Sequence, residues 1–345
     1  MLRKVYIELT DSCNLSCDIC FRHQWVHKPM DMYENVWETV VKQIKESAEI
    51  HSVVLGGMGE PLLSPFFEKT VNELRDKNLH VTSNATLFRA KLTTDIVKNI
   101  HSFVVSIDGM QEQMYQGRGV VFDDLISNLD FLNYLKKMNN LDNPFLDIQF
   151  VVSRKNIQDI FPLMDVLASK NIRNIVISHL VPQNENQAGD ILYSRYENKE
   201  MKEMFHKIKI HSFKRGLRMI LPEVELKTER KCAFVDEDST FITSSGEIVP
   251  CYRLSHPGRE VIFGRPKSIR QYSFGNVINK TILQLWDDSR YVSFRNKIHN
   301  NHIPSCPDCD LVDGCGLVHD TEFDCEGVSP SCSDCMWSRK FVFCS

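Results

Sequence analysis

Three cysteines in the segment DSCNLSCDIC constrain this 345-residue chain more than any other feature. Cys13, Cys17 and Cys20 have the spacing C-x3-C-x2-C and directly follow the strand-like segment KVYIELT. A fully ligated [4Fe-4S] cube takes four thiolates, so a set of three leaves one iron open to a ligand that is not protein. Zinc sites favour paired C-x2-C or Cys/His sets, and a compact triad without a nearby fourth ligand fits them poorly. The triad therefore predicts an iron–sulfur cluster with an open iron, where chemistry can take place.

Composition narrows the classes of partner. The chain carries 41 Lys and Arg against 45 Asp and Glu, a net charge of -4, and no long basic run, so we expect no nucleic-acid partner. No signal-peptide pattern is present, and no apolar run approaches the ~18 residues of a membrane span. These features predict a cytoplasmic protein with no membrane partner. Its twelve cysteines are then expected to be metal ligands, because reducing cytosol keeps thiols free of disulfides.

From residue 4 to about 222, short β-branched runs alternate with longer amphipathic stretches, which predicts strand–helix units and a parallel sheet. The candidate strands are KVYIEL (4–9), SVVLGG (52–57), LHVTS (79–83), SFVVSID (102–108), FLDIQFVVS (145–153) and NIVISHL (174–180). Six such units predict an α/β fold, a partial (β/α)6 barrel of the TIM type. Between the first two strands, MYENVWETVVKQIKES predicts an amphipathic helix with Asp31 as its cap.

The sequence changes character after residue 222. It becomes rich in Cys, Pro and Asp, with short hairpin-like pieces and few long helical stripes. No cysteine lies between Cys20 and Cys232, and nine lie from Cys232 onward. We therefore predict a barrel domain over residues 1–222 and a small cysteine-rich α+β domain over residues 223–345.

Glycines and polar residues follow the predicted strands at their carboxyl ends, where barrels of this kind place their chemistry. Glycines let a ligand approach the backbone, and Glu60 offers a carboxylate to an ammonium group. Hydroxyl, amide and carboxylate groups after the later strands suit a ribose or an amino-acid carboxylate. The candidate cofactor-binding residues are Gly56, Gly57, Gly59, Glu60, Ser83, Asn84, Ser106, Asp108 and Ser153. Each of these residue types also favours turns, so a turn role stays open for every one of them.

The carboxyl-terminal cysteines form a second set of candidate metal ligands. They are Cys232, Cys251, Cys306, Cys309, Cys315, Cys325, Cys332, Cys335 and Cys344. The segment FITSSGEIV predicts a hairpin with its turn at residues 244–246, which brings Cys232 and Cys251 close together. A zinc ribbon is the alternative, and it would use Cys306, Cys309, Cys332 and Cys335. Considered together with the amino-terminal triad, iron–sulfur ligation is the favoured interpretation.

Two histidine pairs carry a weaker signal. His23 and His27 stand four residues apart, as two zinc ligands on a helix do, but Gln24 occupies the place of a metalloprotease's glutamate base. We interpret this pair, and His299 with His302, as solvated or core side chains.

The triad and the turn GGMGE resemble the motifs of radical SAM enzymes. The resemblance implies that the open iron is chelated by the amino and carboxylate groups of S-adenosylmethionine. It also implies that an electron from the cluster breaks the sulfonium bond, giving a 5'-deoxyadenosyl radical that abstracts hydrogen from a target. By the same resemblance the turn around Glu60 holds the amino group of S-adenosylmethionine. Arg118 is a candidate partner of the carboxylate, with a solvated loop arginine as the alternative.

The spacing C-x13-G-x4-C from Cys232, followed by C-x2-C-x5-C from Cys306, resembles the SPASM domain of radical SAM maturases. That resemblance implies two auxiliary [4Fe-4S] clusters. One is expected to share Cys306, Cys309 and Cys315, the other Cys232, Cys251 and Cys325, with Cys332, Cys335 and Cys344 competing for the remaining places. The chain departs from the pattern in two places: nine residues rather than three follow Cys315 before the next cysteine, and Cys232 lacks an upstream partner.

The runs YIELTDSCNLSCDICFRHQW and PSCSDCMWSRKFVFC resemble the maturases of tungsten-containing aldehyde oxidoreductases. The resemblance implies an anaerobic enzyme that modifies a peptide, protein or enzyme cofactor. Its expected partners are a tungsten-containing aldehyde oxidoreductase and a low-potential electron donor such as ferredoxin or flavodoxin. A peptide-modifying enzyme that forms thioethers or epimerises residues is the alternative within the class. A sulfatase maturase fits less well, because Tyr252 stands where that subgroup has an aspartate base.

Two other classes of protein are also compatible with the cysteines. One is a non-catalytic interaction module with structural zinc, and the other is an iron–sulfur electron carrier. Glu60 and the polar strand ends disfavour both, because neither class needs a pocket for an adenosyl group.

Overall fold

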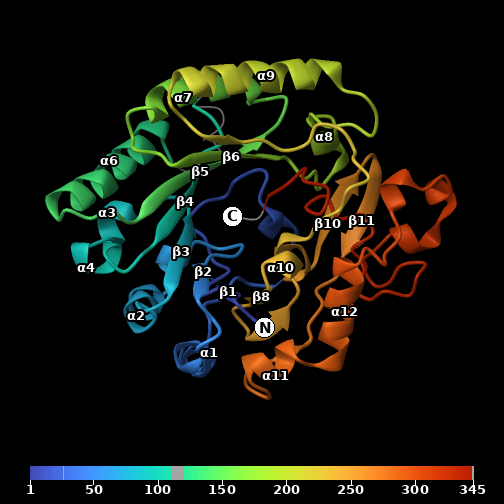
Figure 1. Cartoon of the computed structure of the whole chain (residues 1–345), viewed down its shortest axis with the longest axis horizontal. Helices are drawn as coiled ribbons and strands as arrows, with labels where there is room; N and C mark the ends of the chain where they lie inside the picture. The colour runs from blue at the N-terminus through green and yellow to red at the C-terminus, as the bar shows by residue number, and fades with distance from the viewer. Residues whose placement is uncertain (26, 111–119, 344–345) are drawn as a thin grey trace.

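A computed structural model describes residues 1–25, 27–110 and 120–343, and these residues build one ten-stranded sheet and a separate two-stranded one (Figure 1). In spatial order the large sheet contains β12 (Gly275–Asn276), β9 (Glu247–Val249), β8 (Ser239–Ile242), β1 (Lys4–Ile7), β2 (Ser52–Leu55), β3 (Asn78–Ser83), β4 (Ser102–Ser106), β5 (Phe145–Val152), β6 (Asn174–His179) and β7 (Met219–Ile220). The small sheet pairs β10 (Gly258–Ile262) with β11 (Arg265–Ile269) in antiparallel fashion.

The six predicted strands are confirmed as β1 to β6, and each pairs in parallel with the next. The short strand β7 continues the series beside β6. Side chains such as Val5, Val53 and Ile148 have no exposed surface, as expected when both faces of a parallel sheet are covered. The sheet curves around the centre of the molecule with helices along its outer side (Figure 1), which confirms the expected partial α/β barrel.

Most helices along the barrel are amphipathic segments that bury one face against the strands, whereas the short helix Glu185–Ala188 has no buried residue. They are α1 (Glu34–Glu46), α2 (Phe67–Glu73), α3 (Phe88–Lys91), α4 (Thr94–Val97), α6 (Phe122–Met138), α7 (Ile160–Leu167), α8 (Glu185–Ala188) and α9 (Lys199–Lys214). The predicted cap of α1 is wrong. Its N-cap is Tyr33, without a side-chain hydrogen bond, because Asp31 is held in an isolated antiparallel bridge to Thr10.

The carboxyl-terminal region joins the same sheet. Strand β8 pairs in parallel with β1, from Lys4 opposite Ser239 to Ile7 opposite Ile242. The predicted hairpin is confirmed as β8 and β9, and its turn contains Gly246 at φ +84°, a conformation that favours glycine. The boundary near residue 222 stays a prediction, and the sheet itself runs across it.

The rest of this region consists of short helices and 3-10 turns. They are α10 (Ala233–Asp236), α11 (Ile282–Trp286), α12 (Ser289–His299), η4 (Tyr252–Leu254), η5 (Cys306–Asp308), η6 (Val312–Gly314) and η7 (Gly316–Val318). The chain then returns to the barrel, where the backbone N–H of His179 donates to the Phe341 carbonyl over 2.9 Å. Within the described residues, no helix is long and apolar enough to cross a membrane.

Candidate functional site

The triad of Cys13, Cys17 and Cys20 lies in the loop that follows β1. A turn closes this loop, in which the Cys20 N–H donates to the Cys17 carbonyl over 2.8 Å. Burial raises the pKa of the Cys13 thiol, and the neighbouring Cys20 adds to the rise, while the Arg22 guanidinium opposes it. All three cysteines are half-buried. This donor set fits three corners of a [4Fe-4S] cluster.

The buried Glu60 lies beside this loop, because its backbone N–H donates to the Ser12 carbonyl over 2.8 Å and its charge raises the pKa of Cys13 further. Only 2 % of its surface is exposed. Its carboxylate accepts hydrogen bonds from the Ser83 hydroxyl at 2.9 Å, the Asn84 N–H at 2.8 Å and the Leu62 N–H at 3.2 Å. Burial raises the pKa of Glu60 to about 7 despite these bonds. The structure thus brings together the groups that sequence analysis placed after β2 and β3.

Glycines in the turn after β2 allow it to pack against the end of β1. A Cβ atom on Gly59 would lie 2.3 Å from the Thr10 carbonyl oxygen, and one on Gly57, at φ +140°, would lie 2.7 Å from a Glu8 carboxylate oxygen. Gly56 faces elsewhere, with its Cβ position 3.2 Å from the Tyr252 hydroxyl. The glycines therefore have a packing role that sequence analysis did not identify, and their contact with a ligand stays a prediction.

The polar residues after β4 and β5 meet through Asn156, which sequence analysis missed. The buried Asn156 amide donates to the Asp108 carbonyl over 2.8 Å, and its side-chain oxygen accepts from the Ser153 N–H at 2.7 Å. The Asp108 carboxylate accepts from the Val151 N–H at 2.8 Å. Ser153 also accepts from the Lys155 N–H at 3.3 Å, which is a local turn contact. Ligand roles for Asp108 and Ser153 stay predictions.

The structure gives less support for the predicted ligand roles of Ser106 and Arg118. Ser106 ends β4 in register with Gln149 of β5 and is half-buried, and its ligand role also stays a prediction. Arg118 lies outside the described residues.

Four cysteines from separate segments line one cavity, which we call the four-cysteine cavity: Cys232, Cys251, Cys332 and Cys335. The hairpin of β8 and β9 brings the first two together, as predicted, and the chain end supplies the others. Burial raises the pKa of the Cys251 thiol to about 12, with Cys335 adding to the rise. Burial likewise raises the pKa of Cys332, and the other three thiols add to it. Four half-buried cysteines that line one cavity suit a metal cluster that takes them as thiolates.

The remaining described cysteines lie on the carboxyl-terminal turns. Cys306, Cys309 and Cys315 lie in or next to η5 and η6, and the Cys309 N–H donates to the Cys306 carbonyl over 3.2 Å. Burial makes the largest contribution to the raised pKa of Cys325, and the charges of Asp324, Glu326 and Cys315 raise it further.

The expected grouping of Cys325 with Cys232 and Cys251 stays a prediction, although Cys325 does not line the four-cysteine cavity. Cys332 and Cys335 line it instead, because the segment after Cys325 returns to the hairpin. The placement alone does not exclude the zinc ribbon, because the Cys306 N–H donates over 3.4 Å to the carbonyl of Ser333, which lies between Cys332 and Cys335. Cys344 lies outside the described residues.

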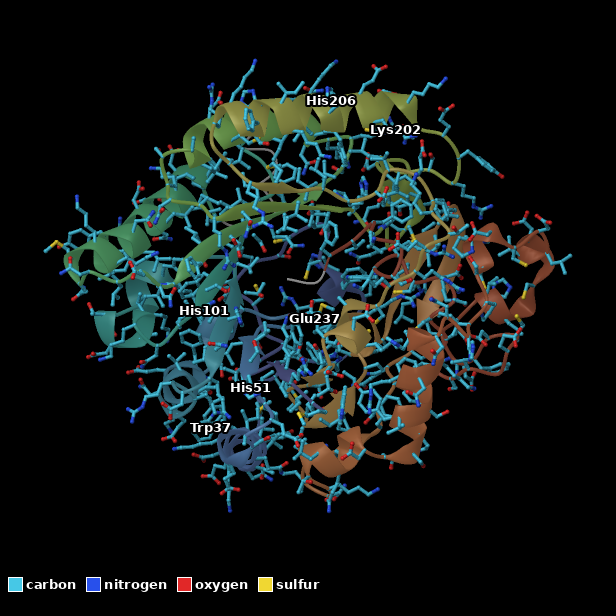
Figure 2. The ribbon with its side chains drawn as sticks, viewed as in Figure 1. Trp37, His51, His101, Lys202, His206 and Glu237 are labelled. Carbon is cyan, nitrogen blue, oxygen red and sulfur yellow. The ribbon has the colours of Figure 1, made fainter. Side chains whose placement is uncertain are left out.

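A larger cavity of about 360 Å³ adjoins the four-cysteine cavity and shares three of its cysteines. Tyr252, whose hydroxyl approaches Gly56, lines it together with Arg253 and Glu237, the last of which is labelled in Figure 2. Arg253 is fully buried and pairs with Glu260 through contacts of 2.9 to 3.1 Å. The sequence does not indicate the pairing of Arg253 with Glu260, because the burial of both residues depends on the tertiary fold.

Comparisons with known proteins agree with this arrangement. A family model described as the Radical SAM superfamily matches residues 7–192, and one described as SPASM, an iron-sulfur cluster-binding domain, matches residues 232–310. The tungsten-containing aldehyde ferredoxin oxidoreductase cofactor-modifying protein of Pyrococcus furiosus is 31% identical over 349 residues, which cover 99% of this chain and 97% of that protein.

Solved structures share the fold. Streptococcus suis SuiB bound to S-adenosylmethionine matches with a TM-score of 0.65 at 17% identity, covering 92% of this chain and 72% of that one. Native anSMEcpe with bound AdoMet and the Cp18Cys peptide matches with a TM-score of 0.58 at 18% identity, covering 92% and 88% of the two chains.

Proposed function

The chain belongs to the radical SAM superfamily, and from this premise we propose that it is a maturase that acts on the cofactor of a tungsten-containing oxidoreductase. It is a radical SAM enzyme whose cofactors are [4Fe-4S] clusters and S-adenosylmethionine. The choice of target is supported by the Pyrococcus furiosus cofactor-modifying protein, because the likeness extends over 99% of this chain at 31% identity.

The observation that carries the proposal is the position of Glu60 beside the triad. A buried carboxylate close to Cys13 and fixed by Ser83 and Asn84 is suited to hold the amino group of a cosubstrate. We assign Cys13, Cys17 and Cys20 to the cluster that supplies the electron for cleavage of S-adenosylmethionine. The surrounding barrel excludes water from the site and orients the cosubstrate toward its target.

We further propose two auxiliary clusters. The first takes the four residues of the four-cysteine cavity. The second takes Cys306, Cys309, Cys315 and Cys325. The 360 Å³ cavity is our candidate for the target site, because it shares cysteines with the four-cysteine cavity and is lined by Tyr252, whose hydroxyl lies near Gly56. A ferredoxin or flavodoxin is the proposed electron donor, since the chemistry needs a low-potential electron.

The first experiment tests the enzyme class. Protein reconstituted anaerobically with iron and sulfide is reduced, given S-adenosylmethionine and assayed for 5'-deoxyadenosine. We expect product from the wild type and from Ser16→Ala, a neighbouring exposed position in the same loop, and none above background from Cys17→Ala. Product formation by Cys17→Ala would contradict the assignment of the triad.

The second experiment tests the target. The reduced enzyme is incubated with an immature tungsten-containing oxidoreductase, and the extracted cofactor and the polypeptide are both examined by mass spectrometry. We expect a mass change on the cofactor that depends on S-adenosylmethionine. A change confined to the polypeptide would instead favour the peptide-modifying alternative.

A further inference from the structure

A group of metal-binding side chains that contains no cysteine lies between the end of β1 and the loop after η4. We propose that Asp11, His27 and His256 bind one divalent first-row transition-metal ion of the Mn²⁺ class, separate from the iron–sulfur clusters. Each residue offers one ligand atom, and these atoms all lie within 4.8 Å of one another. Two imidazoles and one carboxylate are a ligand set typical of such ions.

Asp11 is prepared for this role by its surroundings. It lies four residues after the end of β1 and is 1 % exposed, and one carboxylate oxygen accepts a hydrogen bond from the Met30 N–H. The other oxygen lies 3.0 Å from Nε2 of His27. A ligating carboxylate is commonly fixed in this way by a hydrogen bond to its second oxygen. This separation of 3.0 Å between Asp11 Oδ2 and His27 Nε2 is close to the distance between two adjacent ligand atoms bound to one metal ion.

The ring of His256 is held by the buried carboxylate of Glu8, which lies 248 positions earlier in the chain. Its Nε2 lies 2.8 Å from Oε2 of Glu8, which is 0 % exposed. The other Glu8 oxygen accepts from the Met58 N–H at 2.9 Å. An imidazole that donates one N–H to a carboxylate presents its second nitrogen as a lone-pair donor. This is the usual arrangement around metal-ligating histidines, in which the carboxylate fixes the ring.

Charge balance favours a bound cation at these side chains. Glu8 and Asp11 together bring two buried negative charges, which need compensation. The rings of His27 and His256 are stacked 5.7 Å apart at 17°, with Trp25 against both, so the two imidazoles are held side by side. A divalent ion bound to these rings and to Asp11 would compensate the two carboxylates from a single position.

The site also has an entry path, which a functional metal site requires. His256, Trp25 and Met58 line a small cavity together with Arg253. Side-chain exposure of His27 is 36 %, so one ligand faces solvent while the others are buried.

Binding of Mn²⁺ to the holoprotein tests the proposal independently of the proposed function, since neither S-adenosylmethionine nor a target is present. The protein, with its clusters in the diamagnetic oxidised state, is titrated with Mn²⁺. Binding is followed by electron paramagnetic resonance, as the loss of the six-line signal of the free ion. We expect one ion per chain. His256→Gln and His27→Gln should each weaken binding by at least about tenfold, and Glu8→Gln by roughly 10- to 100-fold through loss of ring orientation. Zn²⁺ should displace the bound Mn²⁺, as the general affinity order requires.

His51→Gln is the matched control, because His51, which is labelled in Figure 2, is exposed and precedes the amino end of β2. Asp11 follows the carboxyl end of the parallel strand β1, at the opposite edge of the sheet. The His51→Gln variant should bind like the wild type. Iron content and cluster absorbance verify that each variant is folded. Because His27 is the most exposed of the three ligands, its substitution should disturb folding least. No bound Mn²⁺ in the wild type, or equal binding by both His27→Gln and His256→Gln, overturns the proposal and leaves two ion pairs with adventitious surface binding only.

Discussion

The triad and the four-cysteine cavity differ in how the chain assembles them. The triad comes from a single loop, residues 13–20, and its thiols are half-buried. The four-cysteine cavity draws its thiols from the start and end of a hairpin and from a segment near the chain end. A local loop leaves room for an exchangeable ligand, whereas a cavity closed by remote segments suits a cluster that stays in place. We therefore expect the triad to serve turnover and the four-cysteine cavity to serve both turnover and folding.

The largest expected difference concerns Cys251→Ala and Cys17→Ala. Each should lose about four iron atoms per chain, one cluster's content. Cys251→Ala should also lower Tm by more than about 5 °C, because the cluster joins segments that are remote in sequence. Cys17→Ala should change Tm by less than about 2 °C, since its loop is local. Iron analysis and anaerobic thermal unfolding measure both, and equal Tm changes would remove the distinction.

A second comparison concerns the free energy of unfolding after replacement of Arg253, which lines the four-cysteine cavity, or of Arg22, which lies near the triad. Arg253→Met leaves the buried Glu260 without its partner and should cost about 3–5 kcal/mol of unfolding free energy. Arg22→Met removes a hydrogen bond to the Leu15 carbonyl near the triad and should cost about 0.5–1.5 kcal/mol. Anaerobic denaturant titration measures both variants. If Arg22→Met is the more costly change, the triad loop is less independent of the fold than we infer.

The smallest effect is on cosubstrate affinity, through Glu60. Burial raises its pKa to about 7, so the acid is neutral below that pH and cannot attract an amino group by charge. Affinity for S-adenosylmethionine should therefore rise about tenfold per pH unit from about pH 5.5 and level off above about pH 7. Equilibrium binding to oxidised protein measures it. Glu60→Gln should bind weakly at every pH, and an unchanged pH slope in that variant would assign the titration to another group.

Sequence alone identified what is local or periodic. The strands from β1 to β6 were predicted because their apolar runs are continuous, and the triad because its spacing lies within one loop. Sequence could not place Cys332 and Cys335 with Cys232, because that contact depends on how the segment after Cys325 folds back. The pairing of Glu8 with His256 joins residues 248 positions apart, so no spacing rule applies to it. The cap at Asp31 failed for a similar reason, since its bridge to Thr10 is a tertiary contact.

Strand β1 has two parallel neighbours, and one of them, β8, is made of residues 239–242. During translation the ribosome must therefore produce more than two thirds of the polypeptide before β1 is paired on both sides. Until then β1, the strand that precedes the triad loop, presents an open edge, which is a template for aggregation. A nascent or truncated chain ending before β8 should consequently need chaperone protection, and the cluster of the four-cysteine cavity should form only after residue 335 has been synthesised.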